Sequence, residues 1–137
     1  MLIVILHQTT DTSINFLQAI PTALFSYHAF INNKGDITYL VESSRQALAC
    51  ANCFIKEIPS VDKIAYQIVF ESLDGSLTDV QYMSLGYLLS QLEVQLPQVY
   101  LHSDISSSTD LKLFNRDKGL KAYNKFTPNK TIYTGLE

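Results

Sequence analysis

The chain has 137 residues, of which 47% are hydrophobic, and its formal net charge is −3. This length fits one domain with a sizeable core, so we expect residues 1–137 to form a single domain. The slight negative charge argues against a nucleic-acid partner, and no apolar run approaches the ~20 residues that a membrane span requires. The sequence opens into an apolar run without a charged leader, which predicts a cytoplasmic protein.

The first part of the chain predicts a buried strand followed by a short helix. Leu2 to Leu6 are apolar without alternation, which is typical of a strand that is covered on both faces. After a polar turn, Asp11 or Thr12 is a suitable cap for a helix that ends before Pro21. The strand should therefore lie in the centre of a sheet, with a helix packed beside it.

A hairpin and a long connection come next. Residues 26–32 and 37–41 are β-rich, and the turn between them contains Gly35, which predicts two paired strands. Residues 42–63 have some helical periodicity but no clear cap, so we interpret them as a long surface loop with at most one helical turn. Within this loop, Cys50 and Cys53 have the spacing of a redox or half-zinc motif. Two cysteines do not predict a disulfide framework, and a functional role for them is the less favoured interpretation.

The second half of the chain contains the clearest helix. Residues 64–70 predict another strand, and Thr78 with Gln81 three residues later is a capping box. The residues that follow place four leucines on one helical face: Leu85, Leu88, Leu89 and Leu92.

The last elements complete the predicted architecture. Residues 99–102 form a short strand, and residues 111–126 predict a helix that is interrupted at Gly119. Strands that alternate with helices, with one hairpin included, predict an α/β fold. We expect a mixed, mostly parallel central sheet of about five strands, flanked by helices.

Three polar residues could bind one metal ion. His7 follows the first strand, His102 ends the last one, and Asp110 comes eight residues later, after a serine-rich loop long enough to fold back. A lone histidine at a strand end is more often a surface residue, but two histidines and one aspartate suit zinc and leave a fourth position open for water. That is the arrangement of a catalytic zinc site. Asp104 is either an acceptor that orients His102 or a solvated carboxylate.

Five segments, in this order, carry a resemblance to a known family: LHQTT, SYHAFINNKGDITYLVE, IAYQIVF, LTDVQYMSLGYLLSQL and VYLHSDISSSTDLKLF. Together they resemble the zinc-dependent N-acetylmuramoyl-L-alanine amidases, whose fold is shared with phage lysozyme-type amidases and peptidoglycan recognition proteins. The resemblance covers residues 2 to about 115. It implies zinc as cofactor and hydrolysis of the amide between N-acetylmuramic acid and L-alanine. It also implies peptidoglycan or a muropeptide as partner, with release to act on the cell wall as the alternative to a cytoplasmic location.

The family pattern also assigns individual positions. Its metal ligands fall on His7, His102 and Asp110, and its active-site tyrosine falls on Tyr27. Because Tyr27 and His28 are neighbours on one predicted strand, their side chains point to opposite faces. We expect Tyr27 to donate a hydrogen bond to the oxyanion and His28 to pack on the other side of the sheet.

Three positions depart from the family pattern. Ser108 stands where many members carry a lysine, Gln67 replaces a glutamate, and Ala49 lies at or beside the position of a histidine. An oxyanion-stabilising cation and a general base are therefore missing. The sequence leaves three hypotheses open: a zinc amidase, a related protein that binds muropeptide or another ligand without turnover, and a hydrolase of some other amide or ester.

Overall fold

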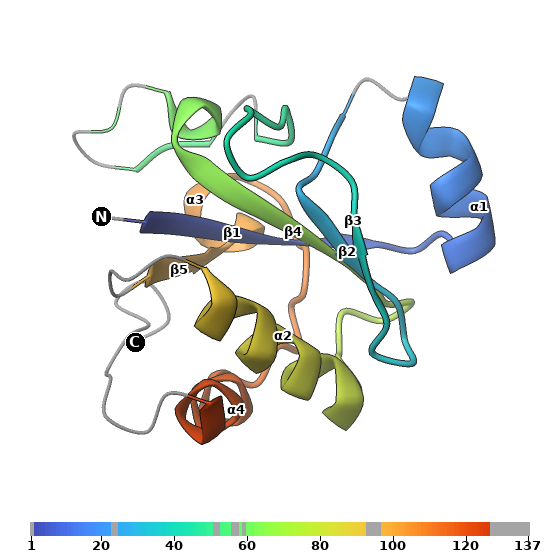
Figure 1. The fold of residues 1–137 in the computed structure, drawn as a ribbon, viewed down its shortest axis with the longest axis vertical. Coiled ribbons are helices and arrows are strands. Elements are labelled where there is room, and N and C mark those ends of the chain that lie inside the picture. The colour runs from blue at the N-terminus through green and yellow to red at the C-terminus, as the bar shows by residue number, and fades with distance from the viewer. Residues whose placement is uncertain are drawn as a thin grey trace.

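The computed structural model describes residues 2–22, 25–50, 53–55, 58, 60–92 and 97–126. Five strands form one sheet in the order β3-β2-β4-β1-β5 (Figure 1). Strand β1 pairs in parallel with β4 and β5, and β2 pairs in parallel with β4 but antiparallel with β3. The predicted α/β fold with a mixed, mostly parallel sheet is therefore confirmed. The strands are β1 (Leu2–Thr9), β2 (Ala29–Ile31), β3 (Ile37–Tyr39), β4 (Ala65–Glu71) and β5 (Pro97–Leu101).

The helices are α1 (Ser13–Ala19), α2 (Asp79–Gln91), α3 (His102–Ile105) and α4 (Arg116–Phe126), with short 3-10 turns η1 (Ile20–Thr22) and η2 (Val61–Lys63). Thr12 caps α1, and Thr78 and Gln81 form the predicted capping box of α2. The interruption expected at Gly119 is wrong, because α4 runs through it. A glycine costs a helix only about 1 kcal/mol, which packing readily offsets. None of these helices, within the described residues, is long and apolar enough to cross a membrane.

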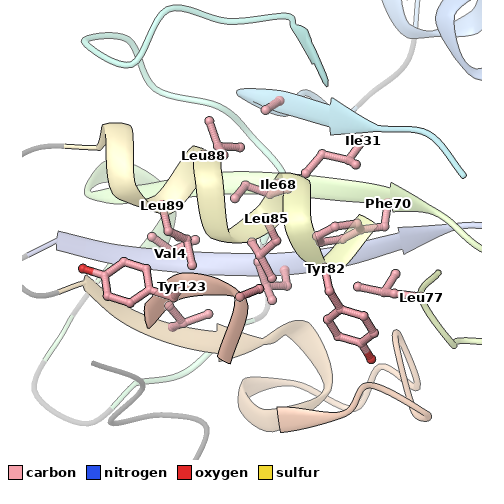
Figure 2. Close-up of a cluster of buried hydrophobic side chains, with 14 of the residues drawn as sticks. Val4, Ile31, Ile68, Phe70, Leu77, Tyr82, Leu85, Leu88, Leu89 and Tyr123 are labelled. Carbon is pink, nitrogen blue, oxygen red and sulfur yellow. The ribbon is translucent and has the colours of Figure 1, made fainter. Parts of the chain in front are cut away.

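One face of the sheet is covered by α2 and α4 (Figure 1). Figure 2 shows α2 directing Leu85, Leu88 and Leu89 onto the strands, as predicted, while Leu92 is only partly buried at the helix end. A Cβ atom on Gly86 would lie 2.5 Å from the carbonyl carbon of Ala122 in α4, so only glycine permits this close approach of the two helices. This face forms the larger core.

The opposite face of the sheet carries the candidate site. Alternation along β1 places Ile3, Ile5 and His7 on this face, beside Gln67 of β4. Helix α1 and the segment after β3 cover it. The interpretation of residues 42–63 as a surface loop is wrong in part, since these five residues are buried: Ala47, Ala49, Cys50, Ile55 and Val61. Apolar side chains of this segment complete the second core. A disulfide joins Cys50 to Cys53, although the sequence analysis did not predict one.

Some boundaries differ from the prediction at positions that matter for the site. Strand β1 continues to Thr9, so His7 lies inside the strand and pairs with Val69. Tyr27 precedes β2 instead of lying within it. His102 is the first residue of α3, directly after β5, because the Asp104 carboxylate accepts a hydrogen bond from the Leu101 amide and so caps a helical turn there.

Candidate metal centre

His7 is held on an interior strand of the sheet with its imidazole neutral. Strand β1 lies between β4 and β5, and the His7 side chain on it is almost completely buried. Its Nε2 lies 2.6 Å from Gln67 Oε1. Burial lowers the pKa of His7 to about 4, although the hydrogen bond to Gln67 acts in the opposite direction. Near neutral pH the ring is therefore uncharged, which is the form that binds metals.

Gln67 and Asp62 determine which ring nitrogen of His7 is protonated and which can bind a metal. Gln67 Nε2 donates to Asp62 Oδ1 at 2.8 Å, and because a carboxylate only accepts, this contact turns Gln67 Oε1 toward His7. The amide oxygen in turn needs a donor, so the proton of His7 lies on Nε2. The Nδ1 lone pair is then left for a ligand on the opposite edge of the ring.

His102 and Asp110 are brought together by the serine-rich loop. Ser106 Oγ donates to the His102 carbonyl at 3.0 Å and accepts from the Ser108 amide at 3.1 Å. Ser108 Oγ then accepts from the Asp110 amide at 3.0 Å. These successive side-chain to backbone hydrogen bonds are typical of serine in turns, and they fold Asp110 back toward the His102 ring.

Gln8 clamps this loop to the end of β1. Its amide donates to Asp110 Oδ2 at 3.1 Å, its side-chain oxygen accepts from the Leu111 amide at 2.8 Å, and its side-chain nitrogen donates to the Ser72 carbonyl at 2.9 Å. Leu111 has a φ of 54°, which is unusual for a bulky residue, and its side chain is fully buried. The clamp therefore stabilises a backbone conformation that would otherwise be unfavourable.

The three predicted ligands converge on one point. Asp110 Oδ2 lies 3.2 Å from His102 Nδ1 and 4.0 Å from His7 Nδ1, and one ligand atom from each residue falls within 4.8 Å of the others. Ligands of a tetrahedral zinc ion lie about 3.3 Å apart, given zinc bonds of about 2.0 Å. The 3.2 Å separation matches this spacing, and the wider ones would close by small side-chain movements, so the donor set of two imidazoles and one carboxylate fits a zinc ion.

The charge of Asp110 is favoured by its neighbours. Burial alone would raise its pKa, but hydrogen bonds with His102, the Gln8 amide and Ser108 hold the pKa below its ordinary value. The carboxylate is therefore ionised near neutral pH and available as an anionic ligand.

Tyr27 lies against the same group of side chains. Its ring meets the His7 ring edge to face, with centroids 5.3 Å apart. Burial, together with the negative charge of Asp110, raises the pKa of Tyr27 to about 12. The phenol therefore keeps its proton and can act as a hydrogen-bond donor.

Other sequence predictions have mixed outcomes. His28 is buried away from the site, as predicted: its ring stacks on Tyr66 and contacts the Arg45 carbonyl at 2.7 Å. Asp104 caps α3 and pairs with Arg116 at 3.0 Å, so its two carboxylate oxygens are used there instead of orienting His102. Of the three departures from the family pattern, Ala49 is buried next to Asp62, and Ser108 belongs to the loop that positions Asp110.

Gln67 has a different role from the one that the family resemblance implies. The resemblance places it at a missing base, but its side-chain amide lies on the Nε2 edge of His7, away from Asp110, and supports the ring. Gln8 and Asp62 were missed altogether. The sequence signal for Gln8 was its place directly after His7. Asp62 offered no signal, since its contact to Gln67 depends on how the 42–63 segment folds.

The comparisons with known proteins agree on the fold. No protein-family model matches the sequence, and no curated protein matches it. Among solved structures, AmpDH3 from Pseudomonas aeruginosa aligns over 96% of this chain with a TM-score of 0.75 and 17% identity, and this chain spans 60% of its length. The N-acetylmuramoyl-L-alanine amidase LysC from Clostridium intestinale URNW aligns over 78% of this chain and 73% of its own, with a TM-score of 0.58 and 18% identity. The endolysin amidase LysCS from the same organism aligns over 78% and 72%, with a TM-score of 0.50 and 19% identity. The resemblance is thus confirmed at the level of the architecture: this chain has the fold of the N-acetylmuramoyl-L-alanine amidases.

Proposed function

We propose that the protein is a zinc-dependent N-acetylmuramoyl-L-alanine amidase, which hydrolyses the bond between N-acetylmuramic acid and L-alanine in peptidoglycan or in muropeptides. The observation that carries this proposal is the convergence of His7, His102 and Asp110 within 4.8 Å on an amidase fold. Three protein ligands leave one position of a tetrahedral zinc ion open, as catalytic sites require. Zinc held there would supply a Lewis acid for the scissile carbonyl and an activated water near neutral pH.

The chain's own residues would orient the reaction. Tyr27, protonated because its pKa is about 12, would donate a hydrogen bond to the oxygen that becomes negative in the transition state. Gln67 and Asp62 would keep the Nδ1 of His7 available to the metal. Because Gln67 lies on the Nε2 edge of His7, away from Asp110, it would support the ring and would not take the proton of the attacking water.

A second candidate function is binding of muropeptide or a related ligand without turnover, as a sensor, inhibitor or competitor. The observation in its favour is that the three departures from the family pattern all have structural roles here. Gln67 supports His7, Ser108 positions the loop, and the buried Ala49 donates a hydrogen bond from its backbone amide to Asp62. The fold and the ligand set would then be retained for recognition.

The deciding experiment compares zinc-loaded protein with two histidine variants. His102→Ala removes a proposed ligand, whereas His28→Gln changes a histidine outside the site and can keep the hydrogen bond to the Arg45 carbonyl. Each protein is incubated with a muramoyl peptide, and mass spectrometry detects the free stem peptide. We expect release by the parent and by His28→Gln, and none by His102→Ala.

Calorimetric titration of the same proteins with the muramoyl peptide separates the two candidates. Binding without any release of peptide would replace the amidase proposal by the binding role. Absence of both release and binding would reject both candidates and leave only the fold in common with the amidases.

A further inference from the structure

The Cys50–Cys53 disulfide lies directly beside the proposed zinc ligands. The Cys50 amide donates to Asp62 at 3.2 Å, and the Phe54 amide donates to the carbonyl of Ile105 in α3 at 2.8 Å. These contacts fix the disulfide against the short helix that His102 begins. As a result, the two sulfurs and one ring nitrogen of His102 all lie within 4.8 Å of one another.

We propose that reduction of this disulfide creates a second metal site, formed by Cys50, Cys53 and His102, for zinc or another thiophilic divalent cation. Two cysteines separated by two residues and a histidine are a common zinc ligand set, because thiolates bind this ion strongly. The sulfurs and the imidazole are already close enough to reach one ion after small movements. This inference goes beyond the amidase proposal and does not depend on catalysis.

The two sites exclude each other because they share one imidazole. His102 Nδ1 faces Asp110 at 3.2 Å in the first site, and a neutral imidazole has a single lone pair with which to bind a metal. An ion held by Cys50 and Cys53 would therefore take His102 from His7 and Asp110. The thiolate site carries two negative charges, compared with one from Asp110, so reduction should move the metal toward the cysteines.

The Cys50–Cys53 disulfide can be reduced and re-formed by thiol–disulfide exchange. A thiol reductant attacks one sulfur, most easily that of the less buried Cys53, and a second reductant thiol completes the exchange. The products are two protein thiols and the disulfide of the reductant. Metal binding then releases two protons, one from each thiol. Reoxidation by a disulfide restores the Cys50–Cys53 bond and returns His102 to the first site.

Cobalt provides the probe, because a cobalt ion bound by thiolates has an intense near-ultraviolet charge-transfer band that nitrogen and oxygen ligands do not produce. The full chain is titrated with Co²⁺ before and after reduction by a phosphine, which does not compete for the metal. The phosphine takes oxygen from one water, and the two protons of that water pass to the sulfurs. Four variants accompany the parent: Asp110→Ala, His102→Ala, Cys53→Ser and the double variant Cys50→Ser/Cys53→Ser.

The expected pattern distinguishes the sites. The parent should bind one equivalent of cobalt in each redox state, with the thiolate band present only after reduction. Asp110→Ala should lose binding in the oxidised state and keep the band in the reduced state. His102→Ala should weaken the cobalt affinity of the reduced protein at least tenfold. The double variant has no thiolate and should show no band. Cys53→Ser changes the more exposed cysteine and keeps one thiolate, so it should bind cobalt more weakly than the reduced parent and give a weaker band; it provides this test even if the double variant does not fold.

Other outcomes overturn the proposal. A reduced parent without the thiolate band would mean that no second site forms. An unchanged cobalt affinity in reduced His102→Ala would remove the histidine from the site, and two equivalents bound to the reduced parent would show that the sites do not compete. If the oxidised parent binds no cobalt but the reduced one shows the band, the zinc centre of the proposed amidase fails while the cysteine site stands.

Discussion

At the scale of single residues, Gln67 is the most informative position, because it is fully buried and touches His7 without being a ligand. We expect Gln67→Leu to lower the zinc affinity about 10- to 100-fold, since the leucine can no longer fix the proton of His7 on Nε2. Isothermal calorimetry with zinc measures the change on oxidised protein.

The matched control is Gln81→Leu. Gln81 is an equally buried glutamine at the start of α2, away from the metal ligands. Its side chain accepts a hydrogen bond from the Thr78 amide and donates one to the Glu71 carbonyl. Both variants lose buried hydrogen bonds and should lose stability, whereas only Gln67→Leu should lose zinc affinity. Equal zinc affinities in both variants would show that Gln67 does not orient His7.

The lowered pKa of His7 also lets us predict how the stability of the metal-free protein depends on pH. Its pKa is about 4 in the folded chain, compared with 6.5 ordinarily, so the unfolded chain binds more protons between these values. Stability is therefore complete above pH 6.5 and falls as the pH decreases toward 4, by about 3 kcal/mol for a change of 2.5 pKa units. Urea unfolding in the presence of a chelator, at a series of pH values, measures this slope.

A His7→Gln variant tests whether the slope belongs to this residue. We expect most of the pH dependence between 6.5 and 4 to disappear in the variant. Burial also lowers the pKa of His28, so a smaller slope of the same sign should remain. A variant with the full slope of the parent would assign the acid sensitivity to other groups.

At the scale of elements, the loop from His102 to Asp110 depends on its serine hydroxyls. Ser108→Ala removes the acceptor of the Asp110 amide, so we expect zinc affinity to fall several-fold as the carboxylate loses its fixed position. The exposed neighbour Ser107 provides the control, because Ser107→Ala makes the same chemical change in the same loop. Competition with a chromophoric chelator compares the two affinities, and an equal loss in both would contradict the positioning role of Ser108.

The same elements show how far a single sequence predicts this fold. Periodicity and caps were sufficient for β1, for α2 with its capping box, and for the hairpin around Gly35, because these signals are local. Helix α4 was misjudged at Gly119, where packing against α2 overrides a weak propensity.

The proposed ligands could be predicted from the sequence because they lie at or after the ends of predicted strands. The residue types and the family resemblance grouped His7, His102 and Asp110, and the parallel pairing of β1 with β5 brings the two histidines to one edge of the sheet. The contacts of Gln67 and Asp62 could not be predicted, because they depend on the segment of residues 42–63, which has no periodic signal and folds onto the sheet through tertiary packing. The short distance between Cys50 and His102 could not be predicted either, because Cys50 belongs to the same segment.

At the scale of the whole molecule, the proposed ligands join distant parts of the chain. His7 lies on the first strand of the chain, whereas His102 and Asp110 follow the last one, so a bound ion would link the interior strand β1 to the loop after β5. Without the ion, the loop is attached to β1 through the hydrogen bonds of Gln8 and through Ile105, which packs in the same buried cluster as Ile3 and Ile5. Unfolding must separate these ligands, and zinc should therefore stabilise the entire fold.

We expect zinc at one hundred times its dissociation constant to raise the free energy of unfolding of the oxidised protein by about 2.7 kcal/mol. Thermal and urea unfolding with zinc or with a chelator measure the difference. His102→Ala should show no increase, because two remaining ligands bind zinc weakly, whereas His28→Gln should show the full increase, because His28 lies outside the ligand set. An equal increase in His102→Ala and the parent would place the stabilising zinc elsewhere, and the three residues that converge here would then lose their role as the metal centre.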